Sequence, residues 1–161
     1  MKQKFTLTVA ILTLIELICL CIPSSIVETT YVKEGHFYVP TYTHSRNIFG
    51  VWTSTGKTLG FLLAILLFFS FVAFLLNYLH KNPISKITPW LSVASAIMLG
   101  IYGLYAGVFA DVRDAYFSNS WDLGWLFYVA ILLHAVCVLL AILIRFKKDD
   151  APKTPAEKLE Q

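Results

Sequence analysis

Four long runs of apolar residues constrain the fold of this chain more than any other feature. They cover residues 5–27, 59–79, 90–110 and 125–145, and each is 21 to 23 residues long. A helix needs about 20 residues to cross roughly 30 Å of hydrocarbon. Backbone polar groups in lipid must bond within their own segment, and barrel strands would be only about 10 residues long. The sequence therefore predicts an all-α membrane protein with a bundle of four transmembrane helices.

Composition agrees with this class. Only 14% of the residues are charged and 57% are hydrophobic, whereas a soluble domain is roughly 25% charged. A soluble globular domain, a disordered chain and a nucleic-acid-binding protein are therefore excluded. The first run could be a cleaved signal peptide, but it is longer than the apolar core of about 7–15 residues that such peptides carry, and Glu16 interrupts it. We expect a retained span, one transmembrane domain over residues 1–146, and a disordered cytosolic tail over residues 147–161.

The basic residues predict the orientation. Nine of the 13 Lys and Arg residues lie before the first run, between the second and third, or at the end of the fourth and beyond it. Basic residues favour the cytosolic side, so both termini are predicted to be cytosolic in a multi-pass protein of the plasma membrane. The outer loop over residues 28–58 is rich in β-branched and aromatic residues, including those at 48–52, which predicts two or three short strands. An aromatic belt at the membrane interface would also explain them.

Two polar residues stand near the midpoints of their apolar runs, Glu16 in the first and His134 in the fourth. A carboxylate at this depth costs about 3 kcal/mol, so it needs a partner, a proton or a functional reason. Three hypotheses follow. Glu16 and His134 form a pair that locks the first span to the fourth, or a protonated Glu16 bonds to a hydroxyl such as that of Thr13, or the two residues relay protons.

Small residues form a stripe along the third run at spacings of four, four, three and four. They are Ser92, Ala96, Gly100, Gly103 and Gly107. Such a stripe lets helix backbones approach closely, either within the bundle or against another membrane protein. The sequence contains no nucleophile–base arrangement and no His, Cys or Asp cluster with metal-ligand spacing. We therefore expect no enzyme activity, no cofactor and no metal.

Two short motifs resemble those of a known family. Phe49-Gly50-Val51-Trp52 is similar to the Gly-Leu-Trp motif of the claudin / peripheral myelin protein / epithelial membrane protein superfamily, and Trp121, Gly124 and Trp125 resemble its entry to the last helix. The resemblance implies a four-helix bundle with a small extracellular β-sheet in the first outer loop, anchored to the membrane by Gly50 and Trp52. The family's disulfide-forming cysteines after the motif are missing here, which argues against a paracellular seal.

These features together predict a non-enzymatic, claudin-like membrane protein. It would act in cell junctions, cell adhesion or plasma-membrane organisation through its outer loops, with membrane lipids and either itself or another membrane protein as partners. One alternative is an auxiliary subunit of an ion channel or receptor that docks through its third span. A less favoured alternative is a small proton-coupled transporter that uses Glu16 and His134.

Overall fold

The computed structural model describes residues 2–51, 53–80, 87–110, 112–113 and 117–146. This part of the chain contains four helices that are long and apolar enough to cross a membrane. They are Lys2–Cys21 (α1), Ser54–His80 (α2), Thr88–Leu104 (α3) with the π-helical turn that continues it, and Trp125–Phe146 (α4). The π-helical turn is Tyr105–Phe109 (η2). These lengths and compositions are those of a multi-pass membrane protein.

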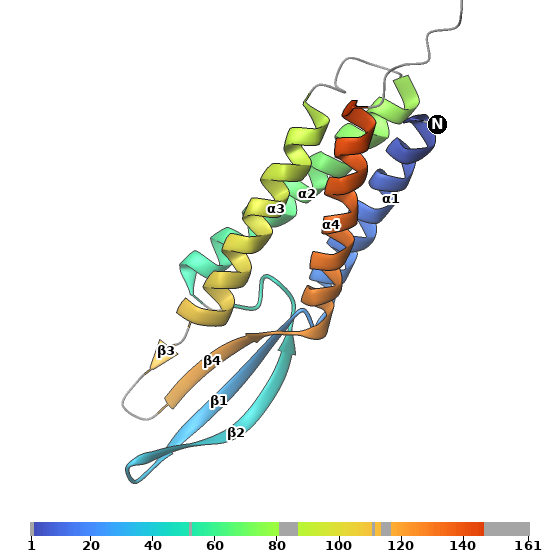
Figure 1. Cartoon of the computed structure of the whole chain (residues 1–161). Helices are drawn as coiled ribbons and strands as arrows, with labels where there is room; N and C mark the ends of the chain where they lie inside the picture. The colour runs from blue at the N-terminus through green and yellow to red at the C-terminus, as the bar shows by residue number, and fades with distance from the viewer. Residues whose placement is uncertain (1, 52, 81–86, 111, 114–116, 147–161) are drawn as a thin grey trace, which may run out of the picture.

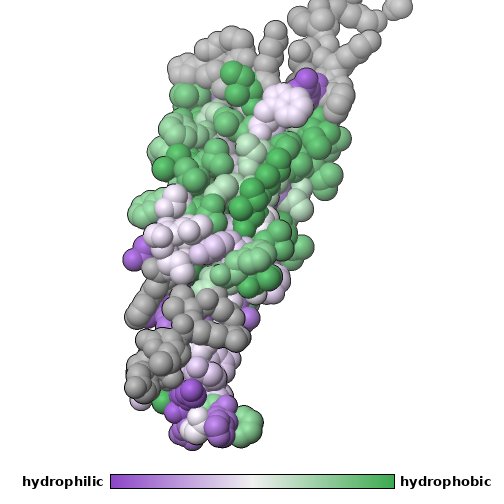
Figure 2. Space-filling model, turned by 90° about the vertical axis from the view of Figure 1, so that its left-hand side faces the viewer, coloured by the Kyte–Doolittle hydropathy of each residue, from purple (hydrophilic) through white to green (hydrophobic). Residues whose placement is uncertain are grey.

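The helices form a ring in which α1 contacts α2 and α4, and α3 contacts the same two helices. Among these contacts, those between α3 and α4 are the sparsest. The chain begins at the end of the bundle where α4 finishes, and the sheet projects from the opposite end (Figure 1). Hydrophobic side chains cover the helices on the face drawn in Figure 2, and hydrophilic ones gather on the sheet. Helices that are apolar on their outward faces suit a lipid surrounding.

The sheet contains Ile26–Glu34 (β1), Phe37–Arg46 (β2), Val112–Arg113 (β3) and Phe117–Leu123 (β4). The strand order is β2-β1-β4-β3, and every neighbouring pair is antiparallel. β1 and β2 form a long hairpin whose two-residue loop contains Gly35 at a φ of 64°. Glycine adopts this left-handed conformation without steric cost, as tight hairpin loops require. The hairpin tip is the part of the sheet farthest from the helices (Figure 1).

The structure corrects three expectations. The first span is shorter than predicted, because α1 ends at Cys21 and the chain turns at Pro23 and Ser24 before it enters β1. Ser24 has a φ of 102°, which a helix does not allow. The sheet is not confined to the first outer loop, since β4 from the second loop pairs along β1. Residues 47–50 form a turn, where the sequence suggested a further strand.

The buried side chains form two apolar clusters with a polar layer between them. One cluster lies at the sheet end and includes Leu20, Leu67 and Phe127, and the other lies toward the opposite end and includes Val9 and Phe74. Along each helix, buried polar residues separate or flank these apolar positions. They are Thr6, Thr13 and Glu16 on α1, Ser70 on α2, Thr88, Ser92 and Ser95 on α3, and His134 on α4. Every helix of the bundle thus contributes a buried polar group to its interior.

Candidate functional site

The centre of the polar layer is a contact between α1 and α4. Nδ1 of His134 lies 2.8 Å from Oε2 of Glu16, and the two residues are 2% and 0% exposed. The other ring nitrogen, Nε2, lies 2.9 Å from the backbone carbonyl oxygen of Ser92 on α3. His134 therefore ties its own helix to two neighbours at once.

These two bonds fix the number of protons on the pair. The Ser92 carbonyl oxygen can only accept, so Nε2 of His134 must carry a hydrogen and donate it. Nδ1 then either accepts from a protonated Glu16 or donates, as part of an imidazolium, to a Glu16 carboxylate. Both arrangements place one proton between Nδ1 and Oε2, and both leave the pair with no net charge. A neutral pair avoids most of the cost of an isolated charge inside a membrane.

The hypothesis that Glu16 bonds to Thr13 is wrong for this structure. The Thr13 hydroxyl donates to the carbonyl oxygen of Val9, at 2.8 Å, one turn earlier on the same helix. It also lies 3.8 Å from Sγ of Cys137 on α4. The structure thus brings Glu16 to His134, as the pairing hypothesis expects, and leaves the proton-relay hypothesis as a prediction.

Three atoms of the polar layer have no hydrogen-bond partner among the described residues. They are Oε1 of Glu16 and the hydroxyl oxygens of Ser70 and Ser92. In the sequence, Ser92 belongs to the packing stripe, and no pattern distinguishes Ser70. A serine inside an otherwise apolar run is a signal that could have found both, because a buried hydroxyl is costly without a partner.

The motif Phe49-Gly50-Val51-Trp52 follows the sheet and leads into α2. The backbone nitrogen of Gly50 donates to the carbonyl oxygen of Asn47, at 2.9 Å, and a β-carbon at Gly50 would overlap the side chain of Arg46. Phe49 packs its ring on that of Phe61, with 4.9 Å between centroids. Val51 is buried in the apolar cluster at the sheet end, and Trp52 lies outside the described residues.

The stronger anchor in this segment is Ile48, which the sequence analysis missed. Its backbone nitrogen donates to the carbonyl oxygen of Leu20 on α1, at 3.1 Å. Its own carbonyl oxygen accepts from the Tyr102 hydroxyl on α3, at 2.6 Å. The Ile48 side chain is buried as well. Backbone groups leave no trace in the sequence, although a tyrosine inside an apolar run indicates that its hydroxyl has found a partner.

The predicted entry to the fourth helix is a tight crossing of two chain segments. Gly124 donates its backbone N–H to Ser25, at 2.9 Å, and a β-carbon on it would collide with the carbonyl group of Ser24. Trp121 is buried in the apolar cluster at the sheet end, whereas Trp125 is exposed on the helix surface. Only glycine permits this approach, so β4 can pass directly into α4 beside the end of α1.

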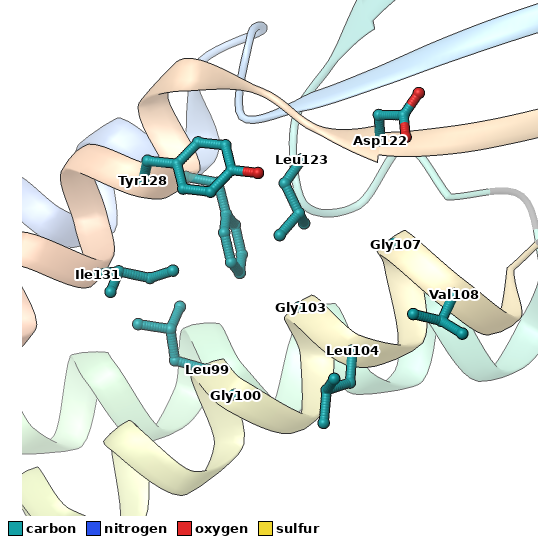
Figure 3. A pocket seen from close by; sticks show the side chains of 11 residues that line it. Leu99, Gly100, Gly103, Leu104, Gly107, Val108, Asp122, Leu123, Tyr128 and Ile131 are labelled. Atoms are coloured by element: carbon teal, nitrogen blue, oxygen red, sulfur yellow. The ribbon is translucent and has the colours of Figure 1, made fainter.

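The small-residue stripe divides into two kinds of position. Ser92 and Gly103 are buried, and a β-carbon on Gly103 would touch the Phe127 ring at 3.0 Å, which is the close packing expected of such a stripe. Ala96 is half-buried. Gly100 and Gly107, where a β-carbon would have room, line an open groove between α3 and α4, and Gly103 lines it as well (Figure 3).

No group of three or more His, Cys, Asp or Glu residues within the described ranges could hold a metal ion. A scan against models of protein families finds no match for this chain, and a search of the curated proteins finds none. The resemblance to the claudin superfamily therefore stays an expectation that rests on the quoted motifs.

Proposed function

We propose that this chain is a non-enzymatic, claudin-like protein of the plasma membrane that makes contacts between cells through its projecting sheet. Both termini would lie in the cytosol and the sheet outside, as the distribution of basic residues predicts. The observation that carries the proposal is the exposed aromatic tip of the β1–β2 hairpin.

Exposed large apolar side chains run along β2 from the tip of the hairpin, at Phe37, to its middle, where Tyr42 lies opposite Thr30. Phe37 is 77% exposed and Tyr42 is 64% exposed. Val39 is exposed between them. A water-facing apolar patch of this kind is typical of a surface that binds another protein.

The strand that carries these residues also has a free edge. β2 is the last strand on its side of the sheet within the described residues, and all of its residues except Arg46 are exposed. An unpaired edge presents backbone N–H and C=O groups that another strand can pair with. Aromatic side chains and a free edge on one strand support a role in docking.

Mixed-cell imaging tests the proposal. Cells without junctions of their own would express the full chain with a cytosolic tag, and contacts between two expressing cells would be compared with contacts in which only one expresses. Enrichment is expected only where both cells express the protein. The double variant Phe37→Ser, Tyr42→Ser should lose the enrichment at unchanged surface level, because both side chains are exposed and contribute little to folding.

The matched control is Thr43→Ser, an exposed position on the same strand that carries no aromatic ring. It should behave like the unchanged protein. An even distribution of the unchanged protein over the cell surface would rule out contact through self-association. If the enrichment survives the loss of both aromatic rings, the contact is not made by these side chains of β2.

A further inference from the structure

The groove between α3 and α4 opens at the side of the bundle (Figure 3). It has a volume of about 410 Å³, and it exists because α3 carries glycines where α4 diverges from it. A β-carbon on Gly100 would meet no atom within 4 Å, and one on Gly107 would lie 3.9 Å from Leu123. The floor of the groove is therefore open backbone.

We propose that this groove binds one phospholipid with an ammonium headgroup, from the leaflet on the side of the sheet. The acyl chain would lie along the glycine floor, and the headgroup would meet Asp122 and Tyr128 at the end nearest the sheet. This site does not depend on the contact function proposed above, and it goes beyond the general solvation of the helices by lipid.

The size of the groove suits an acyl chain. The floor from Gly100 to Gly107 extends over eight residues, or roughly 10 Å of helix. The volume lies within the range of roughly 300–1,000 Å³ that is usual for small-molecule sites. An acyl chain is thin enough to lie in the groove at full depth.

The lining is apolar along most of its length and polar at one end. Leu99, Leu123 and Ile131 line it together with the glycines. At the sheet end the carboxylate of Asp122 stands on the rim, and the Tyr128 hydroxyl is directed toward this end (Figure 3). An apolar channel that ends in polar groups matches the chemistry of a lipid.

The charge of the rim selects the headgroup. Asp122 is exposed, and no Lys or Arg side chain that the structure describes pairs with it. The Asp122 carboxylate attracts an ammonium group through charge, and the face of an aromatic ring such as that of Tyr128 attracts it as well. The same carboxylate repels a headgroup that carries only negative charge. Choline and ethanolamine lipids are therefore favoured over glycerol lipids.

Native mass spectrometry tests the site. The full chain would be released from nanodiscs that contain phosphatidylcholine, phosphatidylethanolamine and phosphatidylglycerol in equal amounts with identical acyl chains. One retained lipid is expected, with the two ammonium lipids enriched roughly two- to five-fold over phosphatidylglycerol, the scale of an exposed ion pair. Asp122→Asn should abolish the preference but keep the bound lipid.

A second variant removes the site without disturbing the bundle. Gly100→Leu combined with Gly107→Leu fills the floor, where a β-carbon meets no close neighbour, and should abolish the retained lipid. Ala135→Leu adds the same bulk to an exposed position of α4 outside the groove and should leave the lipid in place.

Three results would overturn the proposal. They are a retained lipid with no headgroup preference, retention that survives both leucines, and a dimer that the two leucines dissociate. The last result would assign the groove to a second copy of the chain.

Discussion

Replacing Glu16 and His134 singly and together would measure what their contact contributes to the bundle. His134→Ala removes two hydrogen bonds and a buried ring and leaves the Glu16 carboxyl group without a partner. Hydrogen bonds between helices in membranes average about 0.6 kcal/mol and reach about 1.7 kcal/mol. Truncating a large buried side chain costs a further ~2–4 kcal/mol. We expect the free energy of unfolding to fall by about 3–5 kcal/mol for His134→Ala and by about 2–4 kcal/mol for Glu16→Ala.

Glu16→Gln is the sharper variant, because it tests whether a single proton lies between the two side chains. A glutamine amide at this position can donate to Nδ1 while Nε2 of His134 still donates to Ser92. The interaction that Glu16 makes is then kept in a neutral form. The free energy of unfolding should fall by less than about 1 kcal/mol, the size of one ordinary hydrogen bond.

The assay is reversible unfolding in mixed micelles as the fraction of denaturing detergent rises, followed by circular dichroism. Ile15→Ala serves as the control, because its side chain is exposed on the same helix. The double variant Glu16→Ala, His134→Ala should show a coupling energy of about 1–2 kcal/mol. Additivity within about 0.3 kcal/mol would show that the contact does not stabilise the bundle. If Glu16→Gln lowered the free energy of unfolding as much as Glu16→Ala does, the pair would not share a single proton.

Three further substitutions test the junction between sheet and helices. Gly124→Ala should destabilise the protein by about 3 kcal/mol or more, since the added methyl collides with Ser24. Thermal unfolding in detergent would measure the loss, with Gly107→Ala as the control because a methyl group has room there. Tyr102→Phe should cost about 1–3 kcal/mol in the same assay, because it leaves the buried carbonyl of Ile48 without its donor. Arg46→Gln removes the group that pairs with buried Glu28 at 2.9 Å, so limited proteolysis should cut the sheet faster, and a rate equal to that of the unchanged protein would contradict this.

The helices could be predicted from the sequence because an apolar run of sufficient length specifies a spanning helix without reference to its neighbours. The Glu16–His134 contact could be anticipated for a related reason. Each of these residues is the most polar group in the interior of its run, and lipid leaves such groups few partners besides one another. The role of the Ser92 carbonyl could not be anticipated, since every residue has a backbone carbonyl. Only the packing of α3 against α4 decides which of them accepts a hydrogen bond from His134.

The sheet was harder to predict because its central pairing joins distant parts of the chain. Thr29 on β1 lies opposite Ser120 on β4, about ninety residues later. The local pattern of β4, which contains Ser118, Asn119 and Ser120 in succession, gives little sign of a strand. The stripe on α3 shows the same limit, because Gly100 and Gly103 look equivalent in sequence and differ only in how far α4 lies from each.

The direct passage of two strands into two helices has a mechanical consequence. β1 follows α1 after a short turn, so tension on the tip of the β1–β2 hairpin reaches α1 through β1 and α2 through β2. β4 and α4 receive it through the hydrogen bonds between β1 and β4, which are loaded in shear as a group instead of opening one after another. Within the bundle, α1 is joined to α4 by Glu16 and His134. A pull on the hairpin would therefore also be resisted at this contact in the middle of the bundle.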